Sequence, residues 1–236
     1  MYRFLPLIVS LLVIGFTSFL SVPWSPFLIS GMTQADISAK YPTPITPAGF
    51  TFSIWSLIYL SWIIGGIYFI RNQKDKHLRK GHIAFLIAQV LTWIWLIPWG
   101  FEWMWTAFFI MLIILVTLWY SYFHSKKESS IQRWSIELTM GWIHIATFAN
   151  LAVLLRSLWI MNWTSWDSFW GILVLTLAFG ATLYFALRYH TLIVSLIFLW
   201  AALGIYFWQP YSLLILILLF YSSVIFIISL WQGLRR

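Results

Sequence analysis

Long apolar stretches separated by short polar segments run through the whole chain. Eight of these stretches carry few or no charges and are about 20 residues long, which is the length that an α-helix needs to cross a bilayer. They cover residues 4–22, 50–70, 82–99, 103–123, 134–155, 169–187, 191–208 and 211–231. The pattern predicts an all-α, polytopic membrane helix bundle with about eight transmembrane helices.

Basic residues fall almost entirely on one side of these predicted spans. Of the 14 Lys and Arg residues, only Lys40 and Arg156 lie on the other side. Because loops rich in Lys and Arg remain in the cytoplasm, we expect both termini to be cytoplasmic in a multi-pass protein of the cell membrane. A cleaved signal peptide is the alternative for residues 4–22, but the stretch is long and lacks a good cleavage site, so we expect it to be retained.

Composition narrows the possible chemistry. The chain is 62% hydrophobic and 8% charged, so its first partner is the lipid bilayer. The net charge of +8 follows from the topology, and we expect no nucleic-acid partner. Without cysteine there is no disulfide, thiolate nucleophile or Cys-ligated metal. The 18 Trp residues exceed what anchoring at the membrane interface requires, so some rings are expected to line a pocket.

The first loop and the helix that follows it organise the rest of the chain. Residues 23–47 form a polar, proline-rich segment that is long enough to act as a lid. Thr46 is expected to be the N-cap of the next helix. Pro47 suits its first turn, because proline lacks the N–H that this position leaves unpaired.

Four tryptophans lie deep within their predicted spans: Trp55, Trp93, Trp95 and Trp142. An indole N–H in hydrocarbon needs an acceptor, so a tryptophan at this depth faces protein, water or a ligand. We treat these four rings as pocket candidates, with simple packing as the alternative for each one.

The fifth span, residues 134–155, is the only one with ionisable residues in its body. At 100° per residue it has two faces, one with Glu137, Gly141, His144 and Phe148, and another with Trp142, Ala146, Ala149 and Asn150. The second face sets a large ring beside two alanines, which leaves room for a flat ligand or for a neighbouring helix.

The two ionisable groups of this span allow more than one interpretation. Glu137 lies one turn from Arg133, so a paired or snorkelling carboxylate is favoured over a proton relay. The His144 imidazole could donate a hydrogen bond to a backbone carbonyl, donate one to a ligand, or bind haem or a metal as an axial ligand. The sequence has no HExxH, GxSxG or aspartate-rich motif. We therefore assign no catalytic residue, no metal ligand and no resident cofactor.

Two stretches resemble the translocator protein family, whose bacterial members are called tryptophan-rich sensory proteins. Residues 40–47 (KYPTPITP) and 52–59 (FSIWSLIY) are similar to the family's lysine-proline, threonine-proline-proline, tryptophan and tyrosine run. Trp142, Ala146 and Asn150 are similar to the fifth-helix signature, and residues 89–101 loosely follow the third helix. Two departures are Pro47-Ala48 in place of a proline pair, and three helices after residue 155.

The resemblance implies a five-helix bundle over residues 1–155, with three additional transmembrane helices over residues 156–236 packed on it. It also implies a ligand pocket beneath the first loop for tetrapyrroles, sterols or similar flat hydrophobic molecules. The pocket tryptophans of the family carry over to Trp55 and Trp142.

The sequence thus favours a membrane receptor or carrier that binds a planar hydrophobic ligand, with haem or another porphyrin entering only as that ligand. The expected ligand-binding residues are Trp55, Trp93, Trp142, His144, Ala146 and Asn150. Two alternatives remain open: an enzyme that modifies such a ligand through His144 or Glu137, and a structural membrane subunit. Monomer and homodimer are both compatible with the sequence.

Overall fold

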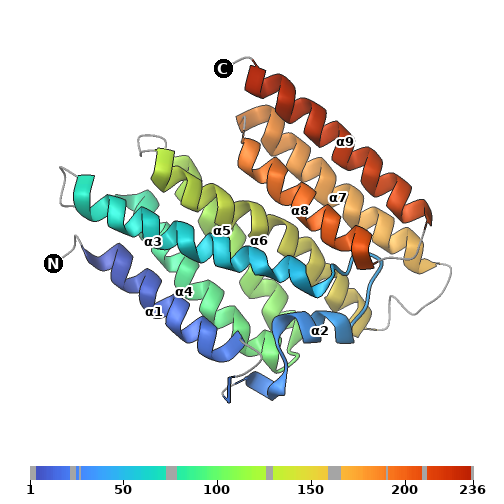
Figure 1. Ribbon diagram of the computed structural model, residues 1–236. Coiled ribbons are helices and arrows are strands. Elements are labelled where there is room, and N and C mark those ends of the chain that lie inside the picture. Colours follow the sequence, from blue (N-terminus) through green and yellow to red (C-terminus); the bar gives the residue numbers. More distant parts are fainter. Residues whose placement is uncertain are drawn as a thin grey trace. The chain divides into compact units, whose positions relative to one another are not determined.

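The described part of the chain is built from helices and turns. The computed structural model describes residues 4–21, 25–26, 28–72, 79–125, 130–158, 166–189, 191–208 and 212–234, and these ranges contain no strand (Figure 1). The α-helices are α1 (Leu5–Ser21), α2 (Gln34–Lys40), α3 (Ile54–Asn72), α4 (Lys80–Gly100), α5 (Met104–His124), α6 (Ser130–Ser157), α7 (Trp166–Tyr189), α8 (Leu192–Trp208) and α9 (Ser212–Leu234). Two short 3-10 helices, η2 (Ile29–Gly31) and η3 (Gly49–Ser53), lie in the first loop.

The helices suit a membrane in length and composition. In the described ranges, five segments are long and apolar enough to span a bilayer: Gly49–Arg71, Lys80–Gly100, Met104–His124, Ser130–Ser157 and Phe169–Tyr189. Three shorter apolar helices are Leu5–Ser21, Leu192–Trp208 and Ile217–Ile228. The predicted all-α membrane bundle is confirmed, and the count of eight spans is approximate.

Part of the prediction about orientation falls outside the described residues. Seven of the basic residues on which it depends lie there: Arg3, Lys74, Lys76, Lys126, Lys127, Arg235 and Arg236. The cytoplasmic position of both termini therefore stays a prediction.

The helices form two compact units. Unit 1 consists of Met1–Gln34 and Ser53–Met140, and unit 2 of Ala35–Phe52 and Gly141–Arg236. Helix α6 contributes residues 130–140 to unit 1 and residues 141–157 to unit 2. The predicted division at residue 155 follows the sequence resemblance rather than compactness, and it stays a prediction.

Polar contacts between apolar helices hold unit 1 together. The Ser10 hydroxyl of α1 donates to Oε1 of Gln89 in α4 at 3.0 Å. Trp62 Nε1 of α3 donates to the hydroxyl of Thr139 in α6 at 2.8 Å. Both pairs are buried, and lipid offers no competing partner, so each bond fixes one helix against another.

Small residues bring helices of unit 1 close to one another. A Cβ added at Gly66 of α3 would lie 3.0 Å from the Leu7 Cα of α1, so glycine favours this close approach. Helices α4 and α5 are antiparallel neighbours, joined by the turn at Phe101–Trp103, where the Trp103 N–H donates to the Pro98 carbonyl at 2.8 Å. So short a connection returns α5 along α4.

Unit 2 has an apolar core made by α6, α7, α8, α9 and the first loop. Ala152 of α6 packs there with Val174, Leu175, Phe198, Ala202, Ile205, Leu218, Ile225 and the loop residue Ile45. Phe179 of α7 stacks on Tyr221 of α9 with a centroid distance of 4.1 Å. The three C-terminal helices therefore pack against the second half of α6.

The first loop docks on two glycines of unit 2. Pro44 occupies the space that a Cβ at Gly171 of α7 would need, and Thr51 occupies the equivalent space at Gly204 of α8. The Ala48 N–H donates to the Gly204 carbonyl at 2.9 Å. No local sequence pattern indicates that the loop and α8 share this contact.

The second span begins at Gly49, close to its predicted place, but its predicted N-cap is wrong. Thr46 is not an N-cap: its hydroxyl accepts the Thr43 N–H at 2.7 Å, and α3 begins only at Ile54, after η3. The reason is tertiary, because Ala48 gives its N–H to α8 rather than to a local helical turn.

Gly204→Ala should destabilise the protein by roughly 1–3 kcal/mol, because the new methyl group would lie 2.9 Å from the Thr51 Cβ in a packed site. Gly180→Ala is the matched control, since nothing lies within 4 Å of its added Cβ. The control should leave stability unchanged or raise it by up to about 1 kcal/mol through helix propensity. Thermal unfolding in detergent, followed by tryptophan fluorescence, measures both, and equal melting temperatures for the two variants would contradict the loop contact.

Ser10→Ala and Gln89→Leu should be energetically coupled, because each removes one partner of the bond between α1 and α4. A double-mutant cycle on unfolding free energies should give about 0.6 kcal/mol, and at most about 1.7 kcal/mol. Thr117→Val combined with Ser10→Ala should give no coupling, since the Thr117 hydroxyl bonds only the Ile113 carbonyl of its own helix. Zero coupling for the first pair would show that the bond does not form.

Candidate functional site

The predicted ligand-binding residues are divided between the two units. Trp55 of α3 and Trp93 of α4 belong to unit 1, and Trp142, His144, Ala146 and Asn150 of α6 belong to unit 2. Their joint participation in one pocket stays a prediction.

Three of the α6 residues form one face of the helix. Trp142 is buried, and its ring meets Phe52 of the first loop edge to face, with centroids 6.1 Å apart at 79°. Ala146 lies one turn further on, and the Asn150 amide donates to the Ala146 carbonyl at 2.9 Å. This bond orients the Asn150 side chain along the helix toward Trp142.

His144 lies on a different side of α6. Its ring centroid lies 5.6 Å from that of Phe148 in the same helix and 5.7 Å from that of Phe185 in α7. Two residues further along a helix correspond to a rotation of about 200°, so His144 and Trp142 point in nearly opposite directions. The structure does not bring His144 to the face that carries Trp142.

The two tryptophans of unit 1 have different surroundings. Trp55 stacks on Tyr59, one turn along α3, with centroids 5.6 Å apart at 30°. Trp93 packs against Phe16 of α1, with ring centroids 5.3 Å apart. The Trp93 Nε1 is buried and has no hydrogen-bond partner among the described residues, which leaves a donor for a water or a ligand to satisfy.

The segment that carries Phe52 is fixed by α8. Trp200 Nε1 donates to the Thr51 carbonyl at 2.9 Å. The Phe50 ring meets Trp200 at 5.6 Å and Phe207 at 5.9 Å, in both cases edge to face. Phe52 therefore reaches Trp142 from a segment that α8 holds in place.

Sequence reasoning missed these loop anchors. Trp200 gave no signal because it is one of many tryptophans in an apolar helix. Gly171 and Gly204 are small residues of the kind that allows close packing in lipid, but a small residue cannot show whether a helix or a loop fills the space beside it.

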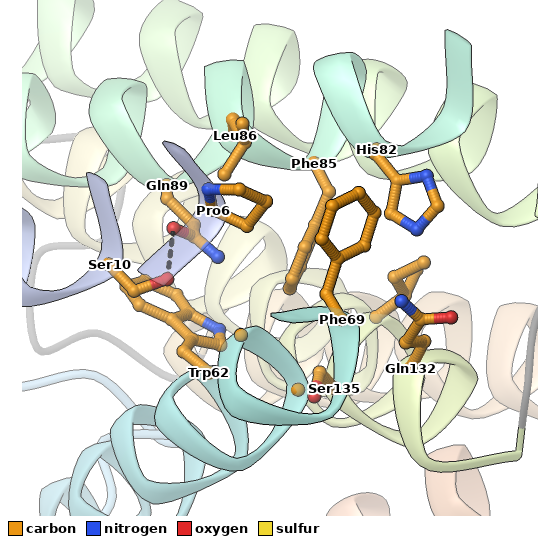
Figure 2. A pocket seen from close by; sticks show the side chains of 13 residues that line it. Pro6, Ser10, Trp62, Phe69, His82, Phe85, Leu86, Gln89, Gln132 and Ser135 are labelled. Atoms are coloured by element: carbon orange, nitrogen blue, oxygen red, sulfur yellow. Dashed lines mark hydrogen bonds between the residues drawn. The ribbon is translucent and has the colours of Figure 1, made fainter. Parts of the chain in front are cut away.

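A second feature, also missed, is a small cavity in unit 1 with a volume of about 30 Å³ (Figure 2). Aromatic rings of Trp62, Phe69 and Phe85 line it together with the polar side chains of Ser10, His82, Gln89, Gln132 and Ser135. The space suits one or two water molecules and is too small for a tetrapyrrole. Gln89, within the predicted span 82–99, was the available signal, because an amide at that depth needs hydrogen-bonding partners.

Glu137 is paired. Its carboxylate lies 3.4 Å from the Arg133 guanidinium, and the same guanidinium lies over the Tyr122 ring at 5.5 Å. The pairing favoured by the spacing of Arg133 and Glu137 is confirmed.

Comparison with known proteins agrees with this architecture. The chain matches the family model described as TSPO-like protein over residues 6–231. No curated protein and no solved structure matches it. The matched region continues past residue 155, where the sequence resemblance was expected to end, so α7, α8 and most of α9 lie within it. The chain is therefore a multi-pass membrane protein that belongs to the TSPO-like protein family, as its resemblance to the translocator proteins predicted.

Proposed function

We propose that this protein is a receptor or carrier for a planar hydrophobic ligand, such as a tetrapyrrole or a sterol, which it binds within the membrane. One observation carries the proposal: a buried tryptophan, Trp142, is held edge-on by Phe52 on the face of α6 that also bears Ala146 and Asn150. Family membership supports the same ligand class.

The chemistry of this face suits a flat molecule. An indole ring offers a broad apolar surface, and planar ligands prefer offset or edge contacts with it. The small side chain of Ala146, which is half-buried, leaves the neighbouring turn of α6 open to close approach. The Asn150 amide adds one polar group, which is the combination typical of pockets that orient an apolar ligand.

The first loop supports the proposal as a cover for the site. Its residues Thr43 and Thr46 bond each other through their side chains and backbone, and Thr51 and Ala48 bond α8. A ligand that reaches Trp142 past Phe52 must displace this ordered segment or enter from the lipid. We further propose that Trp55, which follows Phe52 by three residues, supplies a second stacking surface, and that the protein resides in the cell membrane.

Replacing both stacking rings should weaken binding of protoporphyrin IX. For Trp55→Phe combined with Trp142→Phe, we expect about a 5- to 30-fold higher Kd, because each smaller ring loses part of an aromatic contact. The shift of the porphyrin Soret absorbance in detergent reports binding independently of tryptophan fluorescence.

The matched control for this experiment is Trp105→Phe combined with Trp134→Phe. These rings are 53% and 57% exposed, so the control should leave the Kd unchanged. Undiminished affinity in the Trp55 and Trp142 variant, with a folded protein, would exclude this site.

A receptor or carrier should release its ligand unaltered. Protoporphyrin IX incubated with the purified protein, in light and in darkness, should therefore keep its mass and its absorbance spectrum. Conversion that requires the protein, and that is lost in His144→Phe or Glu137→Gln, would instead favour the enzyme alternative.

A further inference from the structure

A groove of about 450 Å³ runs along unit 1 between α4 and α5, and it shares no lining residue with the cavity described above. Its wall from α4 carries Ile83, Ala84 and Ile87, and its wall from α5 carries Val116 and Thr117. Lys80 and Tyr120 complete the lining. No described residue of this groove is acidic.

The polar groups of the groove lie at the same end. Helix α4 begins at Lys80 and runs toward Ile87, whereas α5 is antiparallel and reaches Tyr120 near its own end. Lys80 and Tyr120 are therefore adjacent to the helix termini, and the apolar positions extend from them for about 10 Å along α4.

The body of the groove is apolar and open to the surroundings. Ile83, Ile87 and Val116 are 45%, 49% and 61% exposed, while Ala84 is buried and forms a shallow floor. The Thr117 hydroxyl is occupied by the Ile113 carbonyl at 2.7 Å, which turns its polar atom toward the helix backbone. In a transmembrane segment such a surface contacts lipid chains.

The charge at the end of the groove is positive. Arg79 and Lys80 are both exposed at the start of α4, and a lysine at a helix end extends its ammonium group toward the lipid headgroups. Arg79, the N-cap residue, makes no side-chain capping hydrogen bond, so the N-terminal N–H groups of this 21-residue helix add a positive dipole end at the same place. The rings of Tyr120 and His124, stacked at 3.9 Å, complete this polar end.

We propose that the groove between α4 and α5 binds an anionic phospholipid, with its phosphate beside Lys80 and the start of α4 and one acyl chain along Ile83, Ile87 and Val116. The distribution of polarity along the groove matches that of the lipid: charge at the helix ends and hydrocarbon deeper in the membrane. The positive charge, with no carboxylate among the described lining residues, favours an anionic headgroup over a zwitterionic one. This site is independent of the proposed porphyrin site.

The test titrates the full-length protein in detergent with phosphatidylglycerol, and separately with phosphatidylcholine of the same acyl chains, and counts bound lipids by native mass spectrometry. The wild-type protein should bind phosphatidylglycerol more tightly. Lys80→Gln should weaken that binding about 5-fold, which corresponds to the loss of one lysine near a headgroup, and should leave phosphatidylcholine unaffected. Lys40→Gln, which removes an exposed lysine elsewhere, should change neither affinity.

A second variant tests the place of the acyl chain. Ala84→Leu fills the floor of the groove while leaving Lys80 intact, so it should weaken phosphatidylglycerol binding, with folding checked by thermal unfolding without added lipid. Equal affinity of the wild type for the two lipids would overturn the proposal. So would unchanged phosphatidylglycerol binding in Lys80→Gln, or in a folded Ala84→Leu protein.

Discussion

The close approach of the first loop to α8 is the contact on which the candidate ligand site depends. The Ala48 N–H bonds the Gly204 carbonyl, Trp200 bonds the Thr51 carbonyl, and no atom larger than hydrogen fits at Gly204 beside Thr51. These bonds satisfy backbone groups of a segment that precedes the α-helix α3, which lipid alone does not do. They also set the position of Phe52, and through it the surroundings of Trp142. The C-terminal helices thus contribute to the site without supplying any of its predicted ligand-binding residues.

In unit 1, polar side chains also need hydrogen-bond partners within the protein, because lipid offers none. Thr17, Thr92 and Thr139 return their hydroxyls to carbonyls four residues earlier in their own helices. Ser10, Trp62 and Ser135 instead bond across to a second helix, and these are the residues that surround the small cavity. The polar groups that link helices therefore gather in one place, around a space that suits one or two water molecules.

The aromatic residues serve two environments. Trp103, Trp105 and Trp134 are more than half exposed and face the surroundings of their unit, whereas Trp62, Trp95 and Trp142 are buried. Buried indoles meet other rings or hydrogen-bond acceptors: Trp95 stacks on Trp99, Trp62 donates to Thr139, and Trp142 meets Phe52. This separation explains why a chain with 18 Trp residues offers only a few as candidates for a ligand site.

The helical spans and the shared face of Trp142, Ala146 and Asn150 were determined by the sequence itself, because bilayer thickness and the 3.6-residue period act within a single helix. The pairing of Arg133 with Glu137 was equally local. Three features were decided only in the tertiary structure. They are the hydrogen bond of Thr46 to Thr43, the start of α3 at Ile54, and the contact of Thr51 with Gly204. Each depends on residues far apart in the chain, such as Thr51 and Trp200, whose meeting no local periodicity encodes. The cavity has the same origin, since its lining comes from four helices and each helix by itself shows only an isolated polar residue or two.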